Sequence, residues 1–332
     1  MDWHIFLAQS QAHKRLKMAV PIGNPPSETD STCWDSRIDF FTKPSTSFSI
    51  EKTFDTLQSP STPVQKYDKF IEFNIPRSPF FIDLSHLMVE WELGIETGDG
   101  RPLPDITTGR AAEGANPAVP AYLGAAYEQC AASTILRDVD IRLNNVNCSP
   151  MHGMYAIQHY LCNILSYNSD TRNSRLELTG FVNERNLEST EIGGYDGHAL
   201  RSEFCSGGKS LFVSTALLTP MTSQPRLLIP LIDVYVGLTI NSDQFCLRSG
   251  MANPDFRMII KKCNLNLRKI KLYDSLTNEI EKKLVNSSCN YILDVYNTKS
   301  YLIPRGSLQI TVHEIFSGQF LPTFAIVGKF NL

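Results

Sequence analysis

Val89-Glu90-Trp91-Glu92-Leu93-Gly94-Ile95 places a large apolar side chain at every second residue. Two further stretches, Ile71-Glu72-Phe73-Asn74-Ile75 and Val139-Asp140-Ile141-Arg142-Leu143, alternate in the same way. Because successive side chains of a strand point to opposite faces, each stretch has one buried and one wet face. This pattern is typical of antiparallel sheets packed on another layer and predicts a β-sandwich.

Composition limits the classes of function. The chain of 332 residues is 42% hydrophobic, which is enough for one large all-β domain or two smaller ones. Its 31 basic and 34 acidic residues are well mixed, so no basic face indicates sequence-specific nucleic-acid binding. The most apolar run, 227–240, contains Pro230 and Asp233 and is too short for a membrane span. The N-terminus lacks a signal-peptide pattern, so we expect a protein that is not secreted.

Eight cysteines are scattered without a CxxC or CxxxC spacing. This spacing argues against zinc clusters and against a dense disulfide framework, so we expect buried free thiols in a reducing compartment. No cofactor is expected.

The order of the elements predicts a jelly roll with decorated loops. Residues 1–45 are predicted to form an extended N-terminal arm, and 96–133 a long loop rich in Gly, Ala and Pro. Helices are predicted over 150–166, with Ser149 as N-cap, and over 274–285. Strands are predicted at 47–57, 68–76, 80–95, 134–147, 209–218, 226–240, 257–272, 300–313 and 323–331.

Candidate chemical motifs are weak. Ser206-Gly207-Gly208-Lys209-Ser210 resembles part of a phosphate-binding loop, but the first glycine position is Glu203 and a strand follows, so a turn is predicted. His152 and His159 lie two helical turns apart, so they and Cys162 are not expected to bind a metal. His86, His198 and His313 lack an acid and nucleophile pattern and predict no catalytic triad.

Two surface features remain open. Asn147 and Asn286 fit the glycosylation acceptor pattern and are expected to be unused without a signal peptide. A basic strand carries Lys261, Lys262, Arg268, Lys269 and Lys271. A solvated edge strand is the favoured interpretation, and contact with nucleic acid or an acidic subunit is the alternative.

A series of motifs occurs in a fixed order over residues 37–330. It comprises Asp39-Phe40-Phe41, Ser49-Ile50-Glu51-Lys52, Ile71 to Pro76, Phe81-Ile82-Asp83-Leu84 leading to Trp91, Val139 to Asn144 with Ser149-Pro150, Leu165 to Asn168, Arg226-Leu227-Leu228, Asp243-Gln244-Phe245, Ile303-Pro304-Arg305-Gly306, and Ile315-Phe316-Ser317-Gly318-Gln319-Phe320. This series resembles the hexon-like major capsid proteins of Maverick/Polinton elements and adintovirus-type viruses.

The resemblance implies a double jelly roll, with two sandwiches in one chain and trimers that form pseudo-hexagonal capsomers. Family members continue beyond the point that matches Leu332. We therefore expect one complete jelly roll in 46–272 and, in 273–332, a linking helix with the opening strands of a second, incomplete one. A gene fragment, a split gene and a decayed copy are the alternatives. The family's Asn-Gly turn after Arg226-Leu227-Leu228 is replaced here by Ile229-Pro230.

These observations predict a structural capsid subunit without catalysis, whose partners are copies of itself and other capsid subunits. Its expected location is the virion, and the nucleus or cytoplasm of the host cell. The alternatives are a cellular jelly-roll module that binds a small ligand or glycan, and a single-jelly-roll, penton-like minor capsid protein. A cupin-like enzyme would need paired histidines on a strand, and the sequence lacks such a pair.

Overall fold

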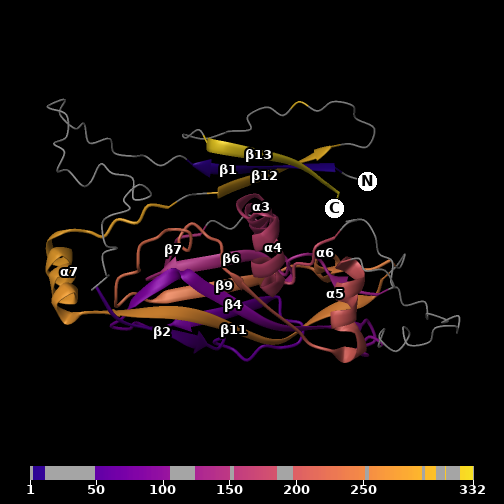
Figure 1. Cartoon of the computed structure of the whole chain (residues 1–332), viewed down its shortest axis with the longest axis horizontal. Helices are drawn as coiled ribbons and strands as arrows, with labels where there is room; N and C mark the ends of the chain where they lie inside the picture. The colour runs from indigo at the N-terminus through magenta and orange to yellow at the C-terminus, as the bar shows by residue number, and fades with distance from the viewer. Residues whose placement is uncertain are drawn as a thin grey trace, which may run out of the picture.

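The computed structural model describes residues 3–11, 49–104, 124–149, 153–184, 197–250, 254–293, 296–303, 311 and 322–331. For 3–11, 296–303 and 322–331 it describes the backbone alone. Figure 1 shows long strands running along the long axis of the molecule, with one helix (α7) at one end and two short helices (α5 and α6) toward the other.

The first sheet contains the two longest strands. Its four antiparallel strands occur in the order β2-β11-β4-β8, with bounds Ile50–Gln58, Phe256–Leu272, Phe81–Thr97 and Leu211–Ala216. Strands β4 and β11 are each 17 residues long and pair along most of their length. They therefore form the centre of this sheet.

The second sheet is shorter. Its strands occur in the order β3-β9-β6-β7, with bounds Phe70–Ile75, Val234–Ile240, Leu136–Leu143 and Val146–Asn147. Every neighbouring pair in it is antiparallel.

The order of pairing is that of a jelly roll. Taken along the chain, the first of these strands pairs with the last (β2 with β11), the second with the seventh (β3 with β9), the third with the sixth (β4 with β8) and the fourth with the fifth (β6 with β7). Lateral pairs β11–β4 and β6–β9 then join these hairpins into two sheets. A long hairpin wrapped in this way gives the jelly-roll topology. The predicted fold class, an all-β jelly-roll sandwich, is therefore confirmed.

One core fills the space between the sheets, and it contains the apolar side chains of the alternating stretches. Val89, Trp91, Leu93 and Ile95 of β4 are all buried, whereas Glu90 and Glu92 are partly exposed. From the second sheet, Phe73, Ile141 and Val236 join the same core. The alternation therefore predicted the buried face correctly at these strands.

Both central strands contain a bulge. In β11, Ile260 pairs with Leu93 and Lys262 with Glu92, so Lys261 is an extra residue. In β4, Asp83 pairs with Arg268 and Met88 with Asn266, so 84–87 face a single residue. Bulges break the period-two phase, which explains why Leu84 and Leu87 are both buried although they are three residues apart.

Short helices and strands occupy the connections. They are β5 Ala126–Tyr127, α2 Ala131–Thr134, α3 Tyr155–Ser166, α4 Ser169–Arg175, η2 Leu176–Thr179, α5 Gly197–Cys205, η3 Ser206–Gly208, α6 Asp243–Cys246, β10 Leu247–Arg248 and α7 Asp274–Asn286. The two predicted helices correspond to α3 and α7. The others were not predicted. Strand β5 and all of α2 except Thr134 lie in the predicted 96–133 loop, of which 105–123 are outside the described residues.

Two predicted boundaries were wrong. Ser149 does not cap α3, which begins at Tyr155. Its hydroxyl instead donates to the Val139 carbonyl oxygen at 2.9 Å and accepts from the Ile141 amide at 2.7 Å, so it fastens the chain to β6. The strand predicted at 226–240 begins only at Val234, and before it Leu228 forms an isolated bridge with Ile82.

A separate three-stranded sheet contains both ends of the chain. Strand β1, Trp3–Gln11, lies between β12, Tyr296–Ile303, and β13, Pro322–Asn331, and pairs with both in antiparallel fashion. No strand was predicted in the N-terminal arm. The division into an arm, a first jelly roll and the start of a second stays a prediction.

Replacing Trp91 with Ala should lower the free energy of unfolding by about 3–5 kcal/mol, because it leaves a large cavity between the sheets. Trp91→Phe should cost much less, since the ring stays apolar and the indole Nε1 has no hydrogen-bond partner among the described residues. Urea unfolding measures both. Phe212→Ala, at a side chain 70% exposed, is the control and should be nearly neutral. Equal losses for the two Trp91 variants would contradict the packing.

Candidate functional site

The motif residues are dispersed through the jelly roll. Of those that the structure describes, Ile50, Glu51 and Lys52 lie on β2, Asp83, Leu84 and Trp91 on β4, Asn144 after β6, Arg226 before β9, and Asp243 and Phe245 on α6. Outside the described residues lie Phe40, Pro150, Pro304, Gly306, Phe316, Gly318 and Gln319, and also His152 and His313. Most of these residues lie apart from one another. Asn144 and the neighbouring motif residues Asn74, Ile75, Pro76 and Arg142 line one cleft.

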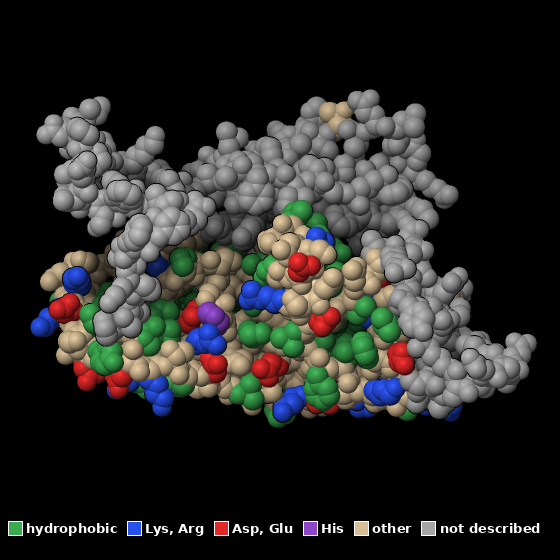
Figure 2. Space-filling model, in the orientation of Figure 1, with side chains coloured by type: hydrophobic (Ala, Val, Ile, Leu, Met, Phe, Trp, Pro, Cys, Tyr) green, Lys and Arg blue, Asp and Glu red, His purple; other side chains and the backbone are tan. Residues whose placement is uncertain are grey.

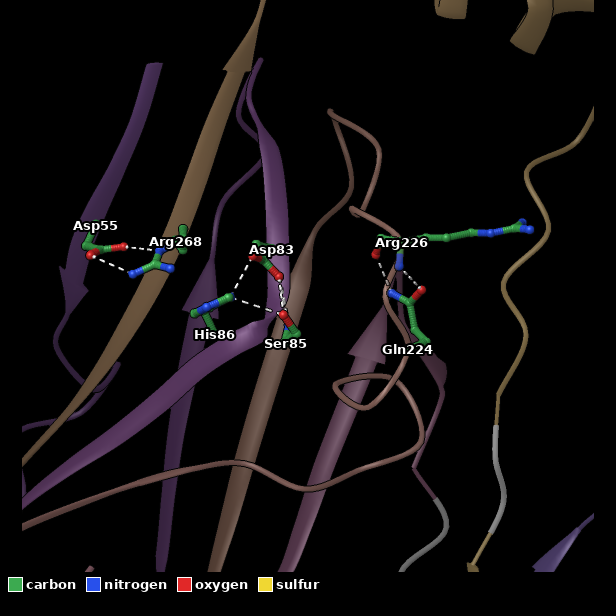
Figure 3. A network of polar contacts seen from close by, with 7 residues as sticks. All are labelled: Asp55, Asp83, Ser85, His86, Gln224, Arg226 and Arg268. Atoms are coloured by element: carbon green, nitrogen blue, oxygen red, sulfur yellow. Dashed lines mark hydrogen bonds and ion pairs between the residues drawn. The ribbon is translucent and has the colours of Figure 1, made fainter. Parts of the chain in front are cut away.

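Asp83 closes the bulge in β4 (Figure 3). One carboxylate oxygen accepts from the Ser85 amide at 3.1 Å and from the Ser85 hydroxyl at 2.6 Å, and the other lies 2.6 Å from His86 Nδ1. An aspartate that binds the backbone two residues ahead stabilises a turn. Asp83 thereby lets Leu84 and Leu87 both reach the core while Ser85 and His86 stay exposed.

Asp83, Ser85 and His86 do not have the geometry of a catalytic triad. Both the aspartate and the serine contact the same imidazole nitrogen, Nδ1, whereas a triad places them on opposite nitrogens. The Ser85 hydroxyl also donates to Asp83, so its proton is not directed to a base. This group of residues stabilises the bulge.

Two of the five basic residues of this strand, Arg268 and Lys271, form ion pairs within the chain. Arg268 donates from Nε to Asp55 at 2.9 Å and from Nη2 to its second oxygen at 3.3 Å (Figure 3). This hydrogen bond lowers the pKa of Asp55. Lys271 pairs with the motif residue Glu51 at 2.9 Å. The interpretation of this strand as an edge was wrong, because β11 lies between β2 and β4. Arg268 and Lys271 thus face acidic residues of β2. On the face drawn in Figure 2, basic and acidic side chains are interspersed.

Asn144 fixes the tight turn between β6 and β7. It has a φ of 46° and Asn145 a φ of 67°, and two central residues with positive φ are typical of hairpin turns that match strand twist. The Asn144 side-chain oxygen accepts from the backbone amide of Asp233 at 3.0 Å, and the backbone amide of Asn144 donates to the Asp233 carbonyl oxygen at 2.9 Å. The motif asparagine therefore ties this turn to the start of β9.

A cleft of about 700 Å³ opens beside this turn. Its lining includes Asn74, Arg77, Arg142, Asn145, Asp233 and Tyr235. The charged groups are paired with residues of the chain: Arg77 Nε lies 2.8 Å from Asp233, and Arg142 binds Asp140 at 2.6 Å while its guanidinium lies over Tyr235. A ligand here would have to compete with these ion pairs.

His159 is a core histidine. Its Nε2 lies 3.2 Å from the Ala216 carbonyl oxygen, and its Nδ1 accepts from the Asn163 side-chain amide at 2.9 Å. These contacts fit a neutral ring with its proton on Nε2, and burial lowers the pKa of His159 to about 4. Both nitrogens are thus occupied. In the part of the chain that the structure describes, no group of three or more His, Cys, Asp or Glu is placed to hold a metal ion.

The glycines before β8 form a turn, as predicted. Gly207 and Gly208 have φ of 64° and 71°, and α5 ends before them at Cys205. Strand β8 follows at Leu211, so no helix N-terminus faces this loop. On the neighbouring surface a hollow of about 560 Å³ lies between Phe204 and Phe212, both more than half exposed.

One polar cluster was missed by the sequence analysis. Arg201 of α5 forms a buried ion pair with Glu184 and donates from Nε to the Tyr127 carbonyl at 2.8 Å. His198, one turn earlier, bonds the Gly124 carbonyl at 3.1 Å. The partners lie 17 to 74 residues apart in the sequence, so no local spacing signals the cluster. It joins α5 to β5.

The cysteines described are free thiols: Cys130, Cys205, Cys246 and Cys263 are buried, Cys148 and Cys162 are partly buried, and Cys289 is exposed. Burial raises the pKa of Cys205 and of Cys246 to about 12, so neither thiol is activated at neutral pH. The expectation of buried free thiols is confirmed for the first four. No helix among the described residues is both long and apolar enough to span a membrane.

Similarity to known proteins is found among solved structures. No protein-family profile matches the chain, and no curated protein matches it. Among solved structures, it is similar to the mavirus major capsid protein (14% identity, TM-score 0.40, over 77% of this chain and 53% of that chain). It is also similar to a chain of the Sputnik virophage (10%, 0.46, 73% and 52%) and of the PBCV-1 virus capsid (14%, 0.42, 72% and 47%). The chain spans about half the length of the solved chains it matches.

Asp83→Ala should lower the free energy of unfolding by about 1–3 kcal/mol, because the Ser85 amide and the bulge lose their acceptor. Asp83→Asn should cost less, since its side-chain oxygen can still accept from Ser85. Urea unfolding midpoints measure the difference. The control is Asp55→Ala, which breaks an exposed ion pair and should cost at most about 1 kcal/mol. If Asp83→Ala cost no more than this control, the carboxylate would not be stabilising the bulge.

His159→Gln should flatten the pH dependence of stability. Unfolded His159 binds its proton near pH 6.5 and the folded residue only near 4. The contribution of neutral His159 is therefore fully present above pH 6.5 and is lost as the pH falls toward 4, by at most about 3 kcal/mol. Urea unfolding from pH 7 to 4 should show a steeper decline for the wild type than for the variant. Phe212→Ala, which removes an exposed side chain that does not titrate, is the control and should follow the wild-type slope.

Proposed function

We propose that this chain is a structural subunit of a viral capsid, of the hexon-like type, and that it functions by self-assembly. The observation that carries the proposal is the jelly-roll pairing of β2 to β11 together with the ordered motif series of the hexon-like family. In this interpretation three of the described motif residues serve the fold: Asp83 stabilises a bulge, Asn144 fixes a turn and Glu51 pairs with Lys271.

The finer assignment follows from the resemblance. The chain would be the first half of a double jelly roll of the Maverick/Polinton or adintovirus type, with 273–332 as the linking helix and opening strands of the second half. Three such subunits would form one pseudo-hexagonal capsomer within the virion. The solved structures that share the fold at low identity include viral capsid proteins, in keeping with this proposal. A penton-like minor capsid protein is the alternative within the same class.

A ligand-binding module is the alternative from another class. It would use the cleft beside Asn144, where Arg77 is paired with Asp233 and Arg142 with Asp140. A ligand would have to compete with these ion pairs, at a cost of at most about 1 kcal/mol for the exposed Arg77–Asp233 pair.

Electron microscopy and sedimentation of the purified chain test the proposal. We expect oligomers, poor solubility of the chain by itself, and stable trimers or shells when a C-terminal sequence that completes the second jelly roll is supplied. A well-behaved monomer, with 300–331 protected from proteolysis and no particles under any of these conditions, would contradict the proposal and favour a single-sandwich protein.

A further inference from the structure

The motif Arg226-Leu227-Leu228 contacts the core of the jelly roll on one side and the residues that follow α7 on the other. Leu228 is fully buried in the main core and exchanges two backbone hydrogen bonds with Ile82 of β4, at 2.8 and 3.1 Å. Leu227 and Ile229, on either side of it, pack instead against a small cluster of Phe81, Ile270 and Leu272. Ile280 of α7 packs on the same cluster, so this short segment has one side on the core and the other near α7.

Residues 287–293, which we name the exit strap, follow α7 and lie against this same motif. The Tyr291 hydroxyl donates to the Leu227 carbonyl at 3.2 Å and accepts from the Ile229 amide at 3.1 Å. Tyr291 and Leu293 both pack against the main core, whereas Ile292 between them is half exposed. The strap therefore lies on the sandwich with alternate side chains turned inward.

Arg226 makes the third contact. Its Nη1 donates to the Asn290 carbonyl oxygen at 2.5 Å, and Figure 3 shows its side chain extended away from Gln224 toward the strap. The backbone of Arg226 is itself held, because the Gln224 side chain accepts from the Arg226 amide at 2.7 Å and donates to its carbonyl at 2.5 Å. Gln224 is buried, so the guanidinium extends from a fixed point.

We infer that Arg226 and Tyr291 form a latch that holds the exit strap on the first sandwich and sets the direction in which the chain leaves it. This inference rests on the proposed function, since in a double jelly roll this direction fixes how the second half sits beside the first. Arg226 is in this sense a positioning residue for assembly. Bonding at both Asn290 and Tyr291 holds two successive strap residues, which prevents the strap from rotating about a single contact.

Chymotrypsin cleavage after residue 291 tests the latch, because proteolysis requires the strap to leave the sandwich. In the full chain, Arg226→Gln should speed cleavage at this site at least about three-fold, because it removes a charge-assisted hydrogen bond. Tyr291→Phe, which keeps a cleavable ring, should speed cleavage and also accelerate hydrogen exchange of the Ile229 amide. The double variant should be faster than either single one.

Arg77→Gln is the matched control. Arg77 is also exposed and hydrogen-bonded, but its partner is Asp233, so cleavage after residue 291 should stay at the wild-type rate. Unchanged cleavage in the double variant, or equal acceleration by Arg77→Gln, would overturn the latch. This outcome is separate from the proposed function: absence of shells from the wild type, with the latch effect present, would count against the capsid role alone.

Discussion

The ladder between β4 and β11 is the interaction on which the rest of the structure depends. These two strands are the longest, and their pairing places Trp91 opposite Cys263 and Leu93 opposite Ile260 at the centre of the core. Strands β2 and β8 add to the two sides of this pair, and α7 begins two residues after β11 ends. A shift of this ladder by one residue would exchange the buried and exposed faces of both strands, so its register sets the core.

Strict alternation made much of this ladder predictable from the sequence. The two bulges were not predictable from it. A period-two pattern identifies a strand because it reports which face is buried. It fails at 84–87 and at Lys261, where an extra length of chain changes the phase and the cause is a local contact such as that between Asp83 and Ser85. Helix α4 was missed for another reason: Ser169–Arg175 has no apolar stripe, although Asn168 accepts from the Thr171 amide as an N-cap.

The candidate site was less predictable than the fold, since its partners come from distant parts of the sequence. The basic residues of β11 suggested a charged edge, but Arg268 meets Asp55 and Lys271 meets Glu51, more than 200 residues earlier. These two pairs offset part of the positive charge of the strand, whose Lys261 and Lys262 are exposed. The buried ion pair of Arg201 and Glu184 could not be predicted either, because neither residue lies in a recognisable motif.

The roles of the motif residues bear on what kind of function this chain can have. A catalytic family concentrates its motif residues around reacting atoms, whereas Asp83, Asn144 and Arg226 each bind backbone groups at different places in the sandwich. Arg226-Leu227-Leu228 makes the contrast clearest, because its three side chains contact the exit strap, the α7 cluster and the main core in turn. Motif residues that hold backbone in place preserve a shape, and a preserved shape is what the proposed role as a subunit of a shell requires.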